Sequence, residues 1–198
     1  MKIVSSWDDG SGWDMRLLDL LKKYKIQGTF YIPTINDLST IEINSIHEEG
    51  FQIGGHTISH PEDLKRLSYE QQLNEIQGNK EYLEELIGDE VTSFCYPGGK
   101  YNEATMGIVE KVGFREARTT MVGSISEPEN RFRRHTTVHV YNGRPEYKGK
   151  TWQEYGWEKF LEADRVDGYF HIWGHSLEIE HYNEWKNLEE FFRKIYDY

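Results

Sequence analysis

Two acidic and two imidazole side chains in the first third of the chain have the types and spacing needed to hold a metal ion. Asp8 and Asp9 are adjacent and follow a short apolar segment, and His56 and His60 are four residues apart. Adjacent carboxylates repel each other, so a nearby cation would balance them. One carboxylate with two histidines leaves coordination positions open for water and substrate. Asp9, His56 and His60 therefore predict a catalytic metal site rather than a structural one.

Each of these segments also has a simpler interpretation. The Asp9-Gly10 pair is common in plain turns with a solvated carboxylate. A lone histidine is usually structural or at the surface, and we expect this for His47 and His181. The glycines at 54–55 and Pro61 around the two candidate ligands indicate a loop, and a loop can also bring both imidazoles onto one cation.

Two later segments carry further candidate chemistry. Tyr96-Pro97-Gly98-Gly99 follows an apolar run, and its glycines would let backbone N–H groups approach a substrate oxygen. A plain Pro-Gly turn is the alternative there. His175 is suited to proton transfer, whereas His171 fits better as a core histidine of an aromatic strand.

The elements that must position these residues alternate along the chain. Strand patterns are expected at residues 2–7, 28–33, 51–55, 92–96, 114–118, 132–140 and 169–173. Helical patterns are expected at 14–24, about 42–50, 68–88, 102–112, 152–163 and 184–196. Such alternation favours a parallel sheet with helices outside it, either open or closed into a barrel. Chemistry in these folds gathers where strands end, which is where the candidate residues lie.

The composition fits one domain over residues 1–198 and excludes several classes of protein. Hydrophobic residues make up 37% and charged residues 29%, which is an ordinary globular balance. The net charge of −11 argues against nucleic acid and against an anionic membrane surface. The single Cys95 excludes an internal disulfide and a multi-cysteine metal site. No apolar run reaches the roughly 20 residues of a membrane helix. Without a signal-peptide pattern the chain is expected to be cytoplasmic, a trimmed secreted form being the alternative.

Four segments, taken in order, resemble the motifs of the NodB-like polysaccharide deacetylases, carbohydrate esterase family four. They are Ser6-Trp7-Asp8-Asp9-Gly10, His56-Thr57-Ile58-Ser59-His60, Tyr96-Pro97-Gly98-Gly99 and Gly174-His175-Ser176. The resemblance runs from about residue 2 to about residue 178. It implies an α/β fold, a distorted (β/α) TIM-like barrel of about seven parallel strands. It also implies a hydrolase that removes N-acetyl groups from N-acetylglucosamine-type poly- or oligosaccharides. One divalent metal ion is implied, with zinc expected and cobalt or nickel as alternatives.

The resemblance also implies residue roles. Asp8 matches the general base, His175 the general acid, and Asp9, His56 and His60 the metal ligands. The segment Tyr96, Pro97 and Gly98 matches the substrate and oxyanion contacts, with the Gly98 N–H facing the oxyanion.

The sequence departs from the family pattern at three points. Cys95 stands where the family has an arginine that orients the base, and Arg118, at the end of the next expected strand, is our predicted substitute. The fourth motif is not recognisable. Ser176 replaces an acidic residue that often follows the last histidine, and Glu178 is a candidate support for His175. Two other functions stay open: a cyclic amide hydrolase of the same fold, and a non-catalytic sugar-binding module. The sequence indicates no oligomeric state.

Overall fold

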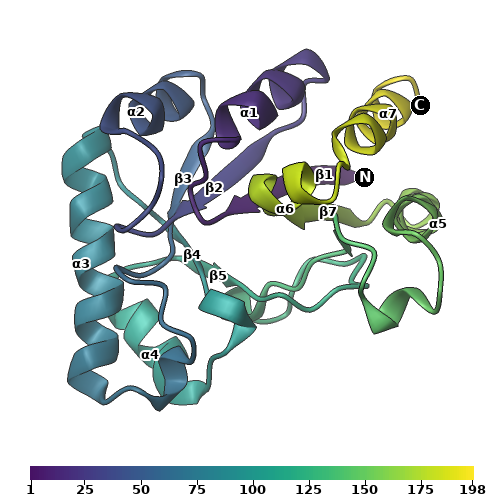
Figure 1. The fold of residues 1–198 in the computed structure, drawn as a ribbon. Helices are drawn as coiled ribbons and strands as arrows, with labels where there is room; N and C mark the ends of the chain where they lie inside the picture. Colours follow the sequence, from purple (N-terminus) through teal and green to yellow (C-terminus); the bar gives the residue numbers. More distant parts are fainter.

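The computed structural model describes residues 1–198 and contains one sheet of seven strands. The strands are β1 (Lys2–Asp8), β2 (Gly28–Ile32), β3 (Gln52–Gly55), β4 (Ser93–Cys95), β5 (Glu116–Arg118), β6 (Val138–His139) and β7 (Tyr169–Gly174). Their order is β5-β4-β3-β2-β1-β7-β6, and all neighbouring pairs are parallel. The sheet curls into a half-barrel, visible in Figure 1. The predicted α/β fold with about seven parallel strands is therefore confirmed.

Seven helices surround the sheet. They are α1 (Asp14–Lys23), α2 (Thr40–Glu48), α3 (Tyr69–Ile87), α4 (Glu103–Val112), α5 (Trp152–Arg165), α6 (Ser176–His181) and α7 (Trp185–Tyr196). The capping box expected at Ser68 is present, with reciprocal bonds to Gln71, and Gly88 ends α3 at a φ of 69°. Six of the helices lie close to the limits expected from the sequence, whereas the short helix α6 was not expected.

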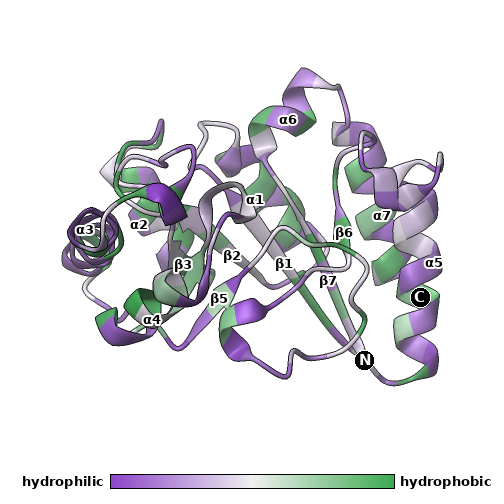
Figure 2. Cartoon of the chain, turned by 90° about the horizontal axis from the view of Figure 1, so that it is seen from below, coloured by the Kyte–Doolittle hydropathy of each residue, from purple (hydrophilic) through white to green (hydrophobic).

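The core lies between the outer face of the sheet and the helices. Leu17 and Leu21 of α1 and Leu188 of α7 are fully buried, as is Phe30 of β2. Figure 2 shows the hydrophobic residues of α5 and α7 on the side that faces the strands. Because apolar burial holds each helix against the sheet, the strand ends are fixed relative to one another.

The segment at 132–140 differs from the expected strand. It begins with a 3-10 helix at Arg131–Arg133, and only Val138–His139 pairs as β6. Arg134 bridges to Arg118 at one edge of the sheet, whereas Val138 pairs with Ile172 of β7 at the other edge. This segment therefore crosses from one sheet edge to the other, so its backbone cannot keep one strand partner throughout.

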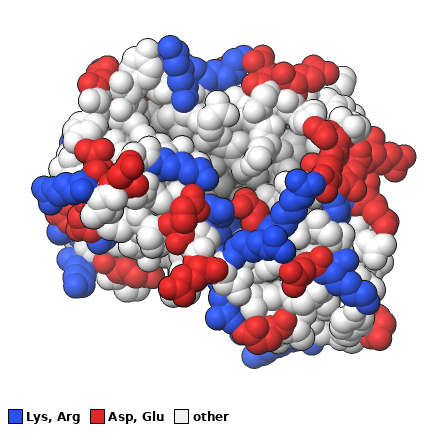
Figure 3. All heavy atoms as spheres, turned by 180° about the vertical axis from the view of Figure 1, so that it is seen from behind, with Lys and Arg blue, Asp and Glu red and all other residues white.

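None of the helices combines the length and apolar composition needed to cross a membrane. Basic and acidic side chains are interspersed over the face drawn in Figure 3, without one continuous basic area.

Candidate active site

Asp9, His56 and His60 meet at the carboxyl ends of β1 and β3. Asp9 Oδ1 lies 3.3 Å from His56 Nε2 and 3.5 Å from His60 Nε2. One ligand atom from each of the three residues lies within 4.8 Å of the others. The histidines share no helix; the loop after β3 brings their rings to a centroid separation of 4.8 Å. The three predicted ligands are therefore together.

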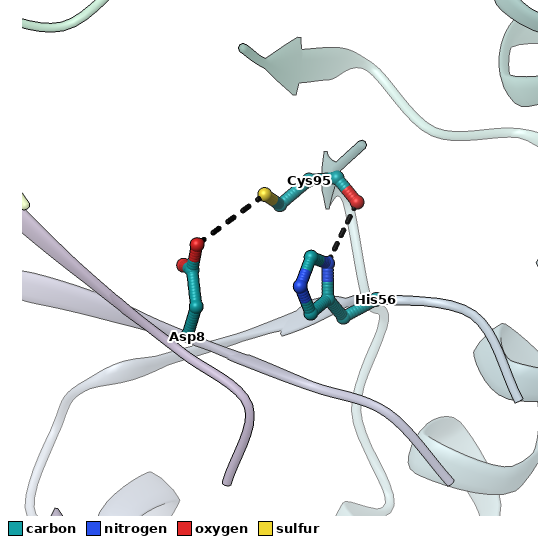
Figure 4. A group of neighbouring side chains, drawn as sticks. All are labelled: Asp8, His56 and Cys95. Carbon is teal, nitrogen blue, oxygen red and sulfur yellow. Dashed lines mark hydrogen bonds between the residues drawn. The ribbon is translucent and has the colours of Figure 1, made fainter. Parts of the chain in front are cut away.

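The orientation of His56 fits a metal ligand. Its Nδ1 lies 2.8 Å from the backbone oxygen of Cys95, as drawn in Figure 4. A carbonyl oxygen only accepts hydrogen bonds, so Nδ1 carries the hydrogen that bonds to it, and Nε2 is the nitrogen that faces Asp9. Metal-binding histidines are commonly held in this way by a carbonyl behind the ring. A carboxylate with two imidazoles suits zinc, cobalt or nickel.

Electrostatics favours an ionised Asp9. Burial alone would raise its pKa, but a hydrogen bond from His56 and the charges of His56, His175 and His60 hold the pKa well below its usual value. A carboxylate that stays ionised is the form a cation binds.

The backbone around these ligands is strained. Asp9, Thr57 and His60 have φ angles of 81°, 69° and 49°, in the left-handed region that residues other than glycine rarely occupy. Such residues typically cost about 1–3 kcal/mol each and persist where the surroundings hold them in place.

Side chains of helix α3 hold the loop after β3 in this strained conformation. Glu75 accepts hydrogen bonds from the backbone N–H groups of Ile58 and Ser59, both at 2.9 Å. Asn79, one turn further on, accepts one from the N–H of His56 at 2.7 Å. The helix therefore fixes the position of both histidine ligands.

Asp8 points into the half-barrel, toward Cys95 and Arg118. It is 2% exposed and forms an ion pair with Arg118, which is fully buried at the end of β5. The Arg118 guanidinium also lies 2.8 Å from Cys95 Sγ and 4.6 Å from the ring centre of Trp173. Figure 4 shows Cys95 close to Asp8, with the thiol 3.7 Å from a carboxylate oxygen. The structure thus pairs Arg118 with the carboxylate that the sequence assigned as base.

His175 follows β7 and faces both carboxylates. Its Nε2 lies 3.9 Å from Asp8 and 3.7 Å from Asp9, while its Nδ1 lies 2.7 Å from Glu178 of α6. Glu178 also contacts His139 of β6, at 3.1 Å. Sequence reasoning missed His139, because only the register of β6 against β7 places it next to Trp173.

The segment after β4 approaches the site with its backbone. The Tyr96 side chain is fully buried, and its hydroxyl donates to the Phe132 carbonyl at 3.1 Å. Pro97 has no N–H, so Gly98, at a φ of 57°, carries the candidate oxyanion donor. His171 lies in the barrel interior, bonded to Ser6 and Tyr169 at 2.8 Å each, as a satisfied core histidine.

Comparison with known proteins identifies the family. The polysaccharide deacetylase family model matches residues 1–117, so the chain belongs to the polysaccharide deacetylase family. YxkH of Bacillus subtilis is 30% identical over 139 residues, which cover 67% of this chain and 50% of that protein. A peptidoglycan-N-acetylglucosamine deacetylase of Bacillus cereus is 28% identical over 116 residues, 57% of this chain and 54% of that protein. The chain spans about half the length of these curated relatives.

A solved structure extends the likeness to nearly the whole fold. A mutant of BA3943 from Bacillus anthracis, described as a family 4 carbohydrate esterase pseudoenzyme with restored activity, superposes with a TM-score of 0.68. The match covers 99% of this chain and 62% of that one at 15% identity, so it shows the fold alone. Because this fold also occurs in a pseudoenzyme, activity must be argued from the site residues.

Proposed function

We propose that this chain is a metal-dependent hydrolase that removes N-acetyl groups from an N-acetylglucosamine-type poly- or oligosaccharide. The observation that carries the proposal is the convergence of Asp9, His56 and His60 beside Asp8, a second carboxylate held by Arg118. Family membership supports deacetylation, and the B. cereus relative, a peptidoglycan-N-acetylglucosamine deacetylase, supports the sugar class.

In this proposal Asp9, His56 and His60 hold one divalent cation, with zinc expected. A cation there would polarise the acetamide carbonyl and make water easier to deprotonate. The remaining steps belong to side chains of the chain itself.

Asp8 accepts a proton from the attacking water, and the Arg118 guanidinium fixes the orientation of its carboxylate. The N–H of Gly98 stabilises the negative charge that develops on the carbonyl oxygen. His175 Nε2 then gives a proton to the leaving nitrogen as the carbon–nitrogen bond breaks, releasing acetate and a free amine. The position of His175 across from Asp8 supports separate roles for a base and an acid.

Acetate release from N-acetylglucosamine oligomers, measured with and without chelator, tests the activity. We expect release that chelator abolishes and added zinc, cobalt or nickel restores. Metal content measured by mass spectrometry should approach one ion per chain. Asp8→Asn should keep that ion and lose turnover, with the exposed Asp19→Asn as control.

Other results would point to a different function. Ring opening of cyclic amides without acetate release would indicate a cyclic amide hydrolase. Oligomer binding without turnover, in a protein that retains its metal, would indicate a sugar-binding module.

A further inference from the structure

Glu178 lies between two histidines. One of its oxygens, Oε2, is 2.7 Å from His175 Nδ1 and 3.1 Å from His139 Nε2. An ionised carboxylate only accepts hydrogen bonds, so both ring nitrogens must donate to it. The two imidazoles are separated by 5.6 Å between ring centres, so they meet through the carboxylate rather than directly.

The protonation states support this arrangement. Burial alone would raise the pKa of Glu178, but the hydrogen bonds from His139 and His175 hold it at about 2. Burial lowers the pKa of His139 to about 4, so this ring is neutral near pH 7. Since its Nε2 carries the hydrogen, its Nδ1 carries the lone pair. This buried Nδ1 has no hydrogen-bond partner in the fold.

The ring of His139 is fixed independently of Glu178. It stacks on Trp173 with a centroid distance of 3.9 Å and an interplanar angle of 10°. The Tyr147 hydroxyl donates to the backbone oxygen of His139 at 2.7 Å and accepts from the backbone N–H of His139 at 2.8 Å. The Nε2–H is thus aimed at Glu178 before any substrate is present, which lowers the cost of ordering the acid in the reaction.

We propose that His139 is a positioning residue for the proton donor of the site, acting through Glu178. This inference rests on the proposed function, in which His175 is the acid. The bond from His139 holds the Glu178 carboxylate in the orientation that receives His175 Nδ1–H. That contact keeps the other nitrogen of His175 facing the reaction centre.

The variant His139→Phe separates the bond to Glu178 from the packing of the imidazole ring. Leaving a buried acceptor unsatisfied destabilises the folded state. His139→Phe keeps an aromatic ring on Trp173 and removes both the donor and the unsatisfied atom. The lost bond to Glu178 lowers stability and the lost unsatisfied atom raises it, so the melting temperature should stay close to that of the unaltered protein. A large fall would mark a structural role for His139.

The kinetic test compares two leaving groups in the zinc-loaded enzyme. An amide needs a protonated leaving nitrogen, whereas an aryl acetate expels a phenolate that needs no acid. For His139→Phe we expect turnover of the N-acetylglucosamine oligomer to fall about 10- to 100-fold. Hydrolysis of p-nitrophenyl acetate should change by less than about 3-fold, because the base and metal ligands are untouched. His139→Gln, which retains an N–H donor without the ring, should recover part of the lost amide turnover.

Nuclear magnetic resonance supplies a readout that does not depend on activity. Long-range nitrogen–proton correlations of the zinc-loaded protein should show His139 as the Nε2–H form and His175 with a hydrogen on Nδ1. In His139→Phe the Nδ1–H signal of His175 should broaden or shift.

The two proposals fail in different ways. Unaltered protein that lacks amide turnover but shows both tautomers would refute the proposed function and leave the contact intact. Equal loss of amide and ester turnover, loss of neither, or His139 as the Nδ1–H form would overturn the role of His139.

Discussion

The guanidinium of Arg118 and the carboxylate of Asp8 form a buried ion pair across the half-barrel, although 110 residues separate them in the sequence. Both side chains are almost wholly removed from solvent. Charges in such a place are expensive to desolvate unless each has its partner. Cys95 lies against the same guanidinium, at the position where related enzymes are expected to carry the arginine. The positive charge is thus supplied from β5 rather than β4.

Removing Arg118 should separate metal binding from turnover. Arg118→Ala leaves Asp8 buried without a counter-charge, which typically costs about 3–5 kcal/mol of unfolding free energy. We expect oligomer deacetylation to fall at least about 100-fold while zinc binding, measured by calorimetry, persists. Arg115→Ala is the matched control. Arg115 directly precedes β5, but its side chain is exposed and paired with Glu90. Unchanged turnover in Arg118→Ala would show that the pair does not serve the base.

A relocation experiment tests whether Arg118 takes the place of the missing arginine. Cys95→Arg alone should be destabilised, because two guanidiniums would share one buried carboxylate. Combined with Arg118→Ala, the new arginine has both the space and the partner. The double variant should therefore recover part of the turnover lost in Arg118→Ala. A double variant less active than either single one would contradict this equivalence.

The residues that meet at the candidate metal site were easier to predict from the sequence than the contacts that support them. Strand ends and helix caps are local features that the sequence can indicate. Once a parallel sheet was inferred, Asp9, His56 and His60 were expected to meet, because they follow strands whose carboxyl ends lie at the same edge. Glu178 was named as a candidate support for His175, but the helix α6 that places it beside His175 was not expected from the sequence. His139 could not be found, because its place depends on the register of a two-residue strand.

The prediction of one strand over residues 132–140 was wrong for a related reason. Its residue types fit a strand, but the chain there crosses between the two sheet edges and pairs only briefly at each. Where a segment crosses between the sheet edges depends on the whole half-barrel. The alternation of residue types along the sequence depends only on local neighbours, so it could not predict the crossing.

Metal binding should be visible as stabilisation. A ligand that binds only the folded state at 100 times its dissociation constant stabilises it by about 2.7 kcal/mol. We expect zinc to raise the melting temperature of the unaltered protein and not that of His56→Ala. His47→Ala is the control, because His47 lies on α2 away from the site and contacts Asp89. An equal zinc shift in His56→Ala would place the metal elsewhere.

Asp14 should make stability depend on pH. This carboxyl is fully buried, one oxygen has no partner, and burial with the charges of Asp9 and Asp8 raises its pKa to about 7. In the unfolded chain the same group titrates near 3.8. The folded state therefore binds more protons between these values, and stability is lost as pH rises from about 4 to about 7.

Asp14→Asn removes this penalty and can still accept the hydrogen bond from Ser176. In chelator, we expect the variant to match the unaltered protein near pH 4 and to be more stable at pH 8. The gain is at most about 4 kcal/mol. Denaturant unfolding at both pH values measures it, with Asp19→Asn as the exposed control. A gain of equal size at pH 4 and pH 8 would rule out ionisation of Asp14 as its cause.

The two glycines after Pro97 should respond differently to substitution. Both have positive φ, 57° for Gly98 and 68° for Gly99. A Cβ on Gly98 would meet only the end of the Lys100 side chain at 3.9 Å, whereas one on Gly99 would lie 2.1 Å from Thr120 Oγ1. Gly98→Ala should therefore cost about 1–2 kcal/mol of backbone strain and keep most activity. Gly99→Ala must push the segment that carries the Gly98 N–H away from Thr120.

We expect oligomer turnover in Gly99→Ala to fall up to about 100-fold, because small displacements of a group that stabilises the reaction strongly reduce the rate. Thr120→Gly removes the obstructing side chain, so the double variant with Gly99→Ala should regain turnover even though the φ strain remains. Initial rates of acetate release at saturating oligomer measure both effects. If Gly98→Ala and Gly99→Ala lose the same activity, the backbone angle rather than the contact with Thr120 sets the requirement for glycine.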